Sequence, residues 1–256
     1  MGVTAMLAAA VVAVSPQHFL LAHQGRDGAF AEKGGRPSVA LTAWAVLGLR
    51  AAHTSVSDAY LRAHEDELQT PTEVALGALA EGRPTPALLA RVEALQPGAS
   101  LNTAAWQLLA LEQAGRPAPA ATVRFLLTHQ SRGGGWSWAV GVAPDSNDTA
   151  AVVQGLRAAG VRGRPIGRAL AYLRGLQNKD GGFSLVRHRP SDAQSTAWTM
   201  QAFLSTGRRP RDAYHYLAHL RRTDGSFRYS TRYAITPVWV TAQVLPALAG
   251  RPFPLR

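Results

Sequence analysis

The sequence contains no cysteine and only three methionines, and 17% of its 256 residues are charged. Without cysteine the chain forms no disulfide and no metal site that depends on thiolate ligands. Isoleucine is also scarce, whereas alanine, leucine and arginine are abundant, and this composition favours helix over sheet. Hydrophobic residues make up 46%, which is enough apolar side chain for a large core and excludes a globally disordered chain.

Long hydrophobic runs are absent too, so we expect no transmembrane span. The apolar run from Met6 to Val14 is much shorter than the roughly 20 residues that cross a bilayer. It resembles the hydrophobic part of a secretory signal, although no Lys or Arg precedes it. We therefore expect residues 1–14 to be a leader of an exported protein. The alternative is an apolar extension of the first helix in a cytoplasmic protein.

The net charge of +11 raises the question of nucleic-acid binding. Its distribution argues against it, because most arginines stand singly or in short groups in turn-like stretches, such as Arg162 and Arg164. No expected helix carries a basic stripe with stacking aromatic residues between the charges. We therefore expect an arginine-rich, solvated surface and no nucleic-acid partner.

An internal repeat is the feature that organises the chain. In four stretches an aromatic residue follows the opening residue by six positions, with a glycine turn between them. The stretches run from Gln24 to Phe30, Gln130 to Trp136, Gln177 to Phe183 and Arg221 to Phe227. A helix-like run precedes each turn, and a second helix-like run, which is richer in small and apolar residues, follows it.

Those second runs also resemble one another, and most end at a glycine. They begin near Ser38, Asn102, Asp148, Ser195 and Thr236, and the glycines are Gly82, Gly115, Gly160, Gly207 and Gly250. Two weaker copies, Asp58 to Gly82 and Ala87 to Gly115, complete six units of about 40 residues each. This spacing predicts one all-α domain over residues 15–256, with more polar outer helices and buried inner helices.

The Gln-x-x-x-Gly-x-Trp/Phe pattern at Gln130 to Trp136 and Gln177 to Phe183 resembles the repeats of squalene–hopene cyclases and class II diterpene cyclases. The related protein prenyltransferase β subunits share their ring. This resemblance implies an α6/α6 toroid of about six helical hairpins whose inner helices line a central cavity. Prenyltransferase zinc is held by an aspartate, a cysteine and a histidine, so the absence of cysteine argues against zinc catalysis. We expect no metal and no other cofactor.

The segment from Pro144 to Ala150 resembles the Asp-x-Asp-Asp-Thr-Ala element of class II cyclases. There the middle aspartate is the general acid that protonates an alkene or epoxide. Asn147 stands at that position, and an amide cannot donate the proton. Asp145 and Asp148 remain as candidate catalytic acids, since burial beside another carboxylate raises a carboxyl pKa. The alternative is structural, with Asp148 as the N-cap of the inner helix.

Aromatic and polar residues near the starts of the inner helices are the candidate ligand-binding residues. In a closed ring the four tryptophans would gather near one mouth of the cavity, where aromatic faces suit a carbocation or a neutral isoprenoid. The alternative is that they fill the core of the ring, and that the polar residues cap helices. The candidates are Trp44, Trp106, Asn147, Asp192, Trp198, Tyr233 and Trp239.

Three functions remain open after this reasoning. The first is a toroid that binds an isoprenoid or another hydrophobic small molecule, or a partner protein, without catalysis. The second is a class II-type isoprenoid cyclase in which Asp145 or Asp148 donates the proton. The third is a structural or protein-interaction ring. Asn147 favours the first and third over the second.

Overall fold

Six helical hairpins form the predicted all-α toroid. The computed structural model describes residues 14–96 and 98–255, so the predicted leader, residues 1–14, lies outside the described residues except for Val14. Over this part the chain forms twelve α-helices, a 3-10 helix at Glu65–Glu67 and isolated β-bridges. The outer helices are α1 Pro16–Leu21, α3 Ala59–Ala63, α5 Pro86–Glu93, α7 Ala120–Thr128, α9 Arg164–Arg174 and α11 Arg211–Leu220. The inner helices are α2 Val39–Ala51, α4 Pro71–Glu81, α6 Leu101–Gln113, α8 Ser146–Ala158, α10 Ala193–Leu204 and α12 Pro237–Leu248.

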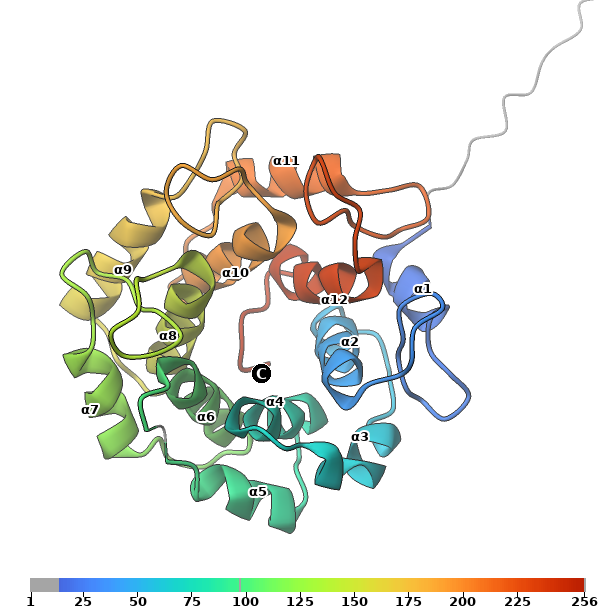
Figure 1. Cartoon of the computed structure of the whole chain (residues 1–256), viewed down its shortest axis with the longest axis horizontal. Coiled ribbons are helices and arrows are strands. Elements are labelled where there is room, and N and C mark those ends of the chain that lie inside the picture. The colour runs from blue at the N-terminus through green and yellow to red at the C-terminus, as the bar shows by residue number, and fades with distance from the viewer. Residues whose placement is uncertain (1–13, 97, 256) are drawn as a thin grey trace, which may run out of the picture.

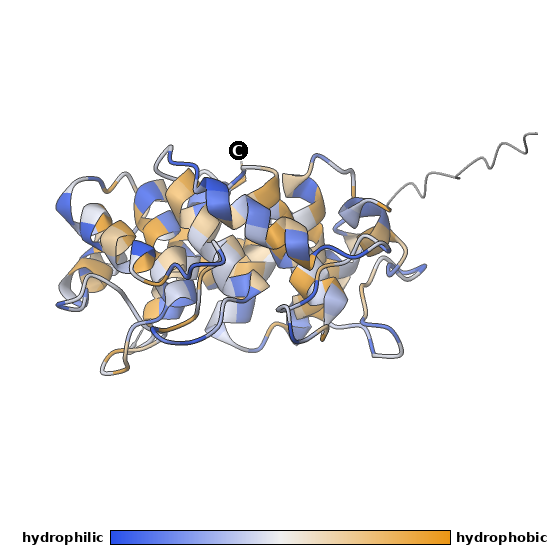
Figure 2. Cartoon of the chain, turned by 90° about the horizontal axis from the view of Figure 1, so that it is seen from above, coloured by the Kyte–Doolittle hydropathy of each residue, from blue (hydrophilic) through white to orange (hydrophobic). Residues whose placement is uncertain are grey.

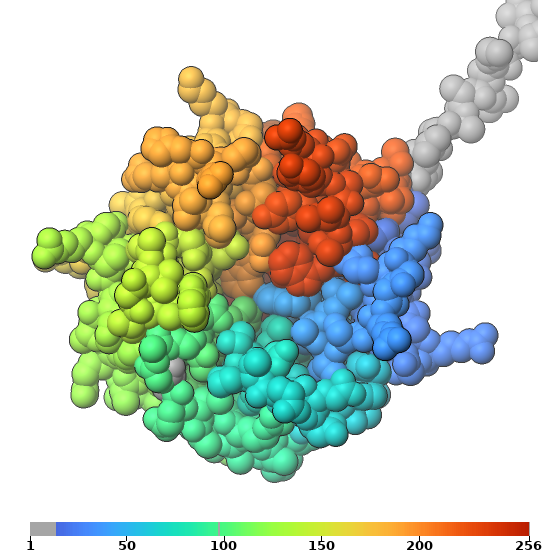
Figure 3. Space-filling view, in the orientation of Figure 1, coloured from blue at the N-terminus to red at the C-terminus, as the bar shows by residue number. Residues whose placement is uncertain are grey.

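The inner helices close a ring. Each packs against the next in chain order, and α12 packs against α2 (Figure 1). Successive segments therefore occupy successive sectors of the surface until the last meets the first (Figure 3). The molecule is a flat disk, with its long loops on one face and its C-terminus on the other (Figure 2).

One hydrogen bond recurs in the four predicted turns and ties each turn to its inner helix. The backbone N–H of the turn aromatic donates to a buried threonine hydroxyl of that helix. The pairs are Phe30 to Thr42 at 2.9 Å, Trp136 to Thr149 at 2.9 Å, Phe183 to Thr196 at 2.9 Å and Phe227 to Thr241 at 3.0 Å. A buried amide without a partner is costly, so this bond fixes where each turn docks.

Three inner helices begin earlier than predicted. The side chains of Ser100, Asp145 and Asp192 cap α6, α8 and α10 by accepting a hydrogen bond from the backbone N–H three residues later. Asp148, which the sequence offered as a cap, is instead the third residue of α8. The threonines that repeat among these inner helices lie inside the first turn, so helix starts predicted next to them fall too late. Outer helix α9 begins at Arg164, followed by Pro165 in its first turn.

The last inner helix borrows its cap from the first repeat. Thr236 precedes α12 in a left-handed conformation, with φ of 41°, and its side chain makes no cap hydrogen bond. The Glu32 carboxylate takes that place, because it accepts from the N–H groups of Val238 at 3.1 Å and Trp239 at 2.9 Å. A carboxylate is favourable at a helix N-terminus, so this contact stabilises the junction between the two ends of the ring.

The centre of the ring is filled, whereas the sequence predicted a central cavity along the inner helices. Trp44, Trp106 and Trp198 meet edge to face there, with ring centroids 5.5–5.6 Å apart. The C-terminal segment runs into the centre of the ring (Figure 1) from the face opposite the long loops (Figure 2). The Phe253 ring packs there against Trp44 and Trp198, with centroid distances of 6.5 and 6.1 Å. Its backbone N–H donates to Gln154 Oε1 at 2.8 Å.

Backbones of neighbouring inner helices come closest at glycines. A Cβ atom at Gly48 in α2 would lie 2.5 Å from the carbonyl oxygen of Ala242 in α12, and one at Gly155 in α8 would lie 2.9 Å from that of Ala105 in α6. These distances are shorter than van der Waals contact. The close packing of α2 against α12 therefore depends on the lack of a side chain at Gly48.

We predict that Gly48→Ala lowers the free energy of unfolding by about 1–3 kcal/mol, because its methyl group pushes α2 away from α12. Gly167→Ala is the matched control, since that glycine lies inside α9 with no atom within 4 Å of an added Cβ. Its expected effect is a gain of up to about 1 kcal/mol from helix propensity. Urea denaturation followed by circular dichroism measures both. Equal effects would contradict the account of closure.

Candidate functional site

A pocket of about 230 Å³ lies at the mouth of the ring where the inner helices begin. The first turns of four inner helices contribute polar residues to it, and tryptophans form much of its wall. Its lining residues are Trp44, Thr72, Leu76, Asn102, Trp106, Asn147, Asp148, Ala151, Gln194, Trp198, Trp239 and Gln243. The four tryptophans predicted to gather at one mouth thus all reach this pocket, which we call the tryptophan pocket.

A buried amide in the pocket lacks part of its hydrogen bonding. Gln243 in α12 is only 2% exposed, and its Oε1 accepts from the indole Nε1–H of Trp198 at 2.9 Å. That bond fixes the orientation of the amide. Its Nε2 group is buried and donates to no described residue. A lining residue of the pocket therefore carries a buried donor without a partner among the described residues.

A short chain of polar groups forms the opposite side of the pocket. Thr72 Oγ1 donates to Asn102 Oδ1 at 3.2 Å, and Asn102 Nδ2 donates to Asp148 Oδ1 at 2.6 Å. The chain joins α4, α6 and α8. This chain holds one oxygen of Asp148 at the pocket wall, and Asp148 is the acidic residue that lines the pocket.

Asp145 lies behind Asp148 and does not line the pocket. Its Oδ1 accepts from the backbone N–H of Asp148 at 2.9 Å, which makes it the N-cap of α8. Burial raises the pKa of Asp145, the Asp148 carboxylate adds to the rise, and the pKa reaches about 7. Tyr172 lies nearby and donates its hydroxyl to the Pro144 carbonyl at 2.6 Å. The two aspartates form a close pair in which only Asp148 reaches the pocket.

The other predicted site residues divide between pocket and periphery. Asn147 lines the pocket beside Asp148. Asp192 is buried as the cap of α10, where it accepts from the N–H and hydroxyl of Ser195 at 2.7 and 2.8 Å, and burial raises its pKa. Tyr233 is 52% exposed and lies outside the pocket lining.

The sequence alone did not single out Thr72, Asn102 as a polar contact, or Gln243. Thr72 belongs to a weak repeat without a glycine turn, and Gln243 lies in the middle of an apolar helix. One signal was available, since a glutamine among Val238 to Leu248 has to find partners inside the core. Asn102 was used only as a helix start.

The pocket can bind a compact ligand and offers one acidic group to it. Aromatic faces suit apolar or cationic groups, and the Gln243 amide suits an oxygen acceptor. Asp145 caps α8 and is not among the lining residues, so it is not placed to donate a proton to a ligand there. Among residues 14–96 and 98–255, no group of three or more His, Asp and Glu side chains is placed to hold a metal ion. In the same residues no helix is both long and apolar enough to cross a membrane.

Solved structures share this fold with low sequence identity. An ent-copalyl diphosphate synthase from Streptomyces platensis matches with a TM-score of 0.58 and 19% identity over 85% of this chain. A glycosidase variant in complex with glucose matches with a TM-score of 0.65 and 11% identity over 92% of this chain. Candida albicans protein geranylgeranyltransferase-I complexed with GGPP matches with a TM-score of 0.59 and 10% identity over 84% of this chain. These matches cover 52%, 94% and 87% of the respective proteins, so the chain spans about half the length of the synthase.

No family model matches the chain, and no curated protein matches it either. At identities of 10–19% the likeness concerns the fold. It confirms an α/α toroid of the kind seen in terpene cyclases, protein prenyltransferases and glycosidases.

The raised pKa of Asp145 predicts a pH-dependent stability. The folded protein keeps this proton up to pH of about 7, whereas an unfolded aspartate releases it near pH 4. The folded state therefore binds more protons between these values, so stability falls as the pH rises from about 4 to about 7 and then levels off. Asp145→Asn keeps a good N-cap and is expected to reduce that slope, measured as urea midpoints at several pH values; part of the slope remains because burial also raises the pKa of Asp192 and Glu81.

Asp145→Ala separates titration from capping. It removes both, so it should lower stability by about 1 kcal/mol at every pH in addition to reducing the slope. A slope unchanged in both variants would mean that Asp145 does not titrate in this range.

Proposed function

We propose that this chain binds a compact hydrophobic ligand carrying an oxygen acceptor in the tryptophan pocket, without catalysis. The observation that carries the proposal is Gln243, which lines an aromatic pocket and whose buried Nε2 group has no partner among the described residues. Leaving such a donor unsatisfied costs about 1–3 kcal/mol. A hydroxyl or carbonyl oxygen of the ligand would remove that cost while its apolar body packs against tryptophan faces.

The volume of the pocket sets the size of the ligand. At about 230 Å³ it has room for about eight water molecules at liquid density. Drug-sized ligands occupy about 300–1,000 Å³. The space favours a body of about ten non-hydrogen atoms, such as a short isoprenoid alcohol. A long isoprenoid would need Trp44, Trp106, Trp198 and Phe253 to leave the centre of the ring.

A cyclase is the second candidate, and one observation favours it. Burial and the neighbouring Asp148 raise the pKa of Asp145 to about 7, so part of this carboxyl is protonated at neutral pH. Its placement weakens the case, because Asp145 caps α8 and lies outside the pocket lining. Asn147 lines the pocket together with Asp148, but its amide cannot supply a proton.

Titration of tryptophan fluorescence with geraniol tests the binding proposal. We expect saturable binding, weaker or absent binding of the longer geranylgeraniol, and none of choline or glucose. Trp239→Ala should weaken geraniol binding about tenfold or more, since the residue forms part of the pocket wall. Trp138→Ala is the matched control, because Trp138 is 57% exposed and lies outside the pocket.

Three outcomes would contradict the proposal. Preferred binding of choline would mean that the pocket selects a cation, and preferred binding of glucose that it selects a sugar. Equal loss in Trp239→Ala and Trp138→Ala would place the ligand elsewhere. New products from geranylgeranyl diphosphate, detected by mass spectrometry and lost in Asp145→Asn or Asp148→Asn, would establish the cyclase.

A further inference from the structure

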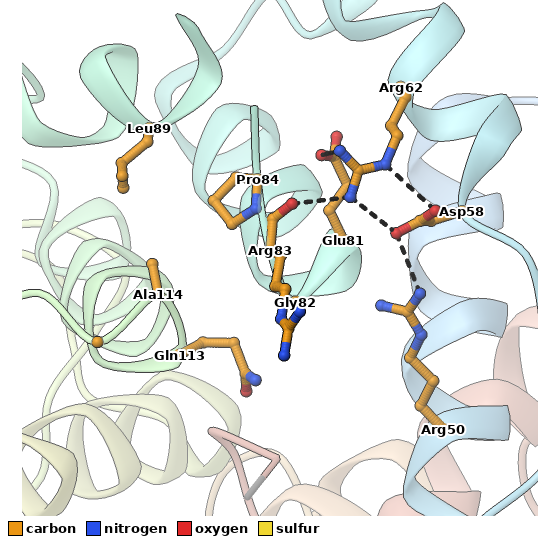
Figure 4. A pocket seen from close by; sticks show the side chains of 11 residues that line it. Arg50, Asp58, Arg62, Glu81, Gly82, Arg83, Pro84, Leu89, Gln113 and Ala114 are labelled. Atoms are coloured by element: carbon orange, nitrogen blue, oxygen red, sulfur yellow. Dashed lines mark hydrogen bonds and ion pairs between the residues drawn. The ribbon is translucent and has the colours of Figure 1, made fainter. Parts of the chain in front are cut away.

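A second pocket, of about 750 Å³, opens at the other mouth of the ring. It lies where α2, α4 and α6 end (Figure 4). The tryptophan pocket lies where the inner helices begin, so the filled centre of the ring separates the two. We call it the arginine pocket. Its lining residues are Arg50, Asp58, Arg62, Glu81, Gly82, Arg83, Pro84, Leu89, Gln113, Ala114 and Gly115.

Two of its three arginines are held in place by Asp58. Arg50 Nη2 lies 3.1 Å from Asp58 Oδ2, and Arg62 donates from Nε and Nη2 to both Asp58 oxygens at 3.2 Å (Figure 4). Burial alone would raise the pKa of Asp58, but the hydrogen bonds and charges of Arg62 and Arg50 outweigh it and hold the pKa below its usual range. Asp58 thus neutralises only part of the positive charge.

The third arginine has no partner. The Arg83 side chain is exposed, lines the pocket and makes no hydrogen bond or ion pair with any described residue. Its backbone carbonyl accepts from Arg62 Nη2 at 2.7 Å, which ties the start of this loop to α3. Arg83 lines the pocket together with Arg50 and Arg62, and a guanidinium can hold an oxyanion through two parallel N–H donors.

Glu81 supplies the observation that points to a ligand. Its side chain is 1% exposed, and neither carboxylate oxygen has a well-formed hydrogen bond within the described residues, although the backbone N–H of Thr85 faces the carboxylate and lowers its pKa. The nearest cation is Arg62, with Nη1 3.7 Å from Oε2. A buried carboxylate normally has hydrogen-bond partners. This one is short of them, and it lines the pocket.

We propose that the arginine pocket binds a small organic oxyanion, a phosphate or a carboxylate, with Arg83 as its main cationic contact and Glu81 as a hydrogen-bond donor to it. The protonated carboxyl of Glu81 would donate to an anion oxygen, and Arg50 and Arg62 would supply the positive field. The proposal is independent of the ligand in the tryptophan pocket.

Binding of the anion is then linked to the proton on Glu81. Burial is the main cause that raises the pKa of Glu81, Glu65 adds to the rise, Arg62 partly offsets it, and the pKa lies at about 7. The charged groups around it are Arg50 from α2, Asp58 and Arg62 from α3, Glu65 from the 3-10 helix and Arg83 after α4. Helix α5 contributes Leu89, with Arg91 bound to the Glu65 carbonyl, and α6 contributes uncharged residues. Ionised Glu81 repels an anion, so affinity should fall between pH 6 and pH 8.

Calorimetric titration of the full chain with inorganic phosphate and with malonate tests the proposal, and the tighter of the two identifies the class of oxyanion. Arg83→Gln is expected to weaken binding about tenfold or more, because it removes a charge-assisted contact. Arg132→Gln is the matched control. It removes the same charge from an exposed loop residue that does not line this pocket, and it should leave affinity nearly unchanged.

Glu81→Gln tests the role of the buried carboxyl. The amide keeps a donor and loses the titration, so binding should persist at pH 8 as at pH 6, with circular dichroism checking that the helices remain. Three results would overturn the proposal: neither anion binds, Arg83→Gln and Arg132→Gln weaken binding equally, or the pH dependence is unchanged in Glu81→Gln.

Discussion

The approach of α12 to α2 is the contact on which the rest of the molecule depends. Six hairpins joined end to end form a ring only when the last inner helix packs against the first. Gly48 makes this packing possible, because a Cβ atom at that position would lie 2.5 Å from the carbonyl oxygen of Ala242. Two further contacts act across the same junction. Glu32 caps α12 from the first repeat, and the carbonyl of Ser15 lies 2.6 Å from the Cβ position of Gly225 in the last turn. Without this closure the apolar faces of α2 and α12 would face water.

Closure also explains why the two mouths differ in charge. All inner helices contribute their beginnings to one mouth and their ends to the other, so partial positive charges of the helix dipoles gather at one side and negative ones at the other. Acidic residues accordingly cap helices on the first side, with Glu32 at α12 and Asp192 at α10. Arginines occupy the second, where Arg50 Nη1 donates to the Ala80 carbonyl at 2.5 Å.

Much of the fold could be predicted because the residues that recur in each repeat act on the backbone close to them. Turn glycines, the aromatic six residues on and the helix-ending glycines each constrain the backbone where they stand. Glycines Gly82, Gly115, Gly160, Gly207 and Gly250 all have positive φ at the ends of inner helices, as their positions predicted. Inner helix starts were placed late because Thr149 and Thr196 look like first-turn residues. Their hydroxyls in fact bind turns that lie thirteen residues earlier in the chain.

The site was less predictable, since its properties depend on contacts between distant segments. The four tryptophans converge because their helices do, which follows from the repeat. That Phe253 fills the space behind them, or that Gln243 is oriented by Trp198 with its Nε2 unpaired, follows from no local pattern. The arginine pocket combines the ends of three repeats, two of them weak, and Asp58 and Glu81 lie in the copy without a glycine turn.

The same ring supports different chemistries in other proteins, so the fold cannot decide among them. What distinguishes this chain is how its centre is used. Trp44, Trp106, Trp198 and Phe253 occupy the space in which a long ligand would lie, and they leave one small aromatic pocket and one larger cationic pocket at opposite mouths. A reaction that needs an acid and a long apolar substrate in one chamber is poorly served by that division. The division suits the binding of one uncharged and one anionic small ligand, because the filled centre keeps each site in its own electrostatic environment.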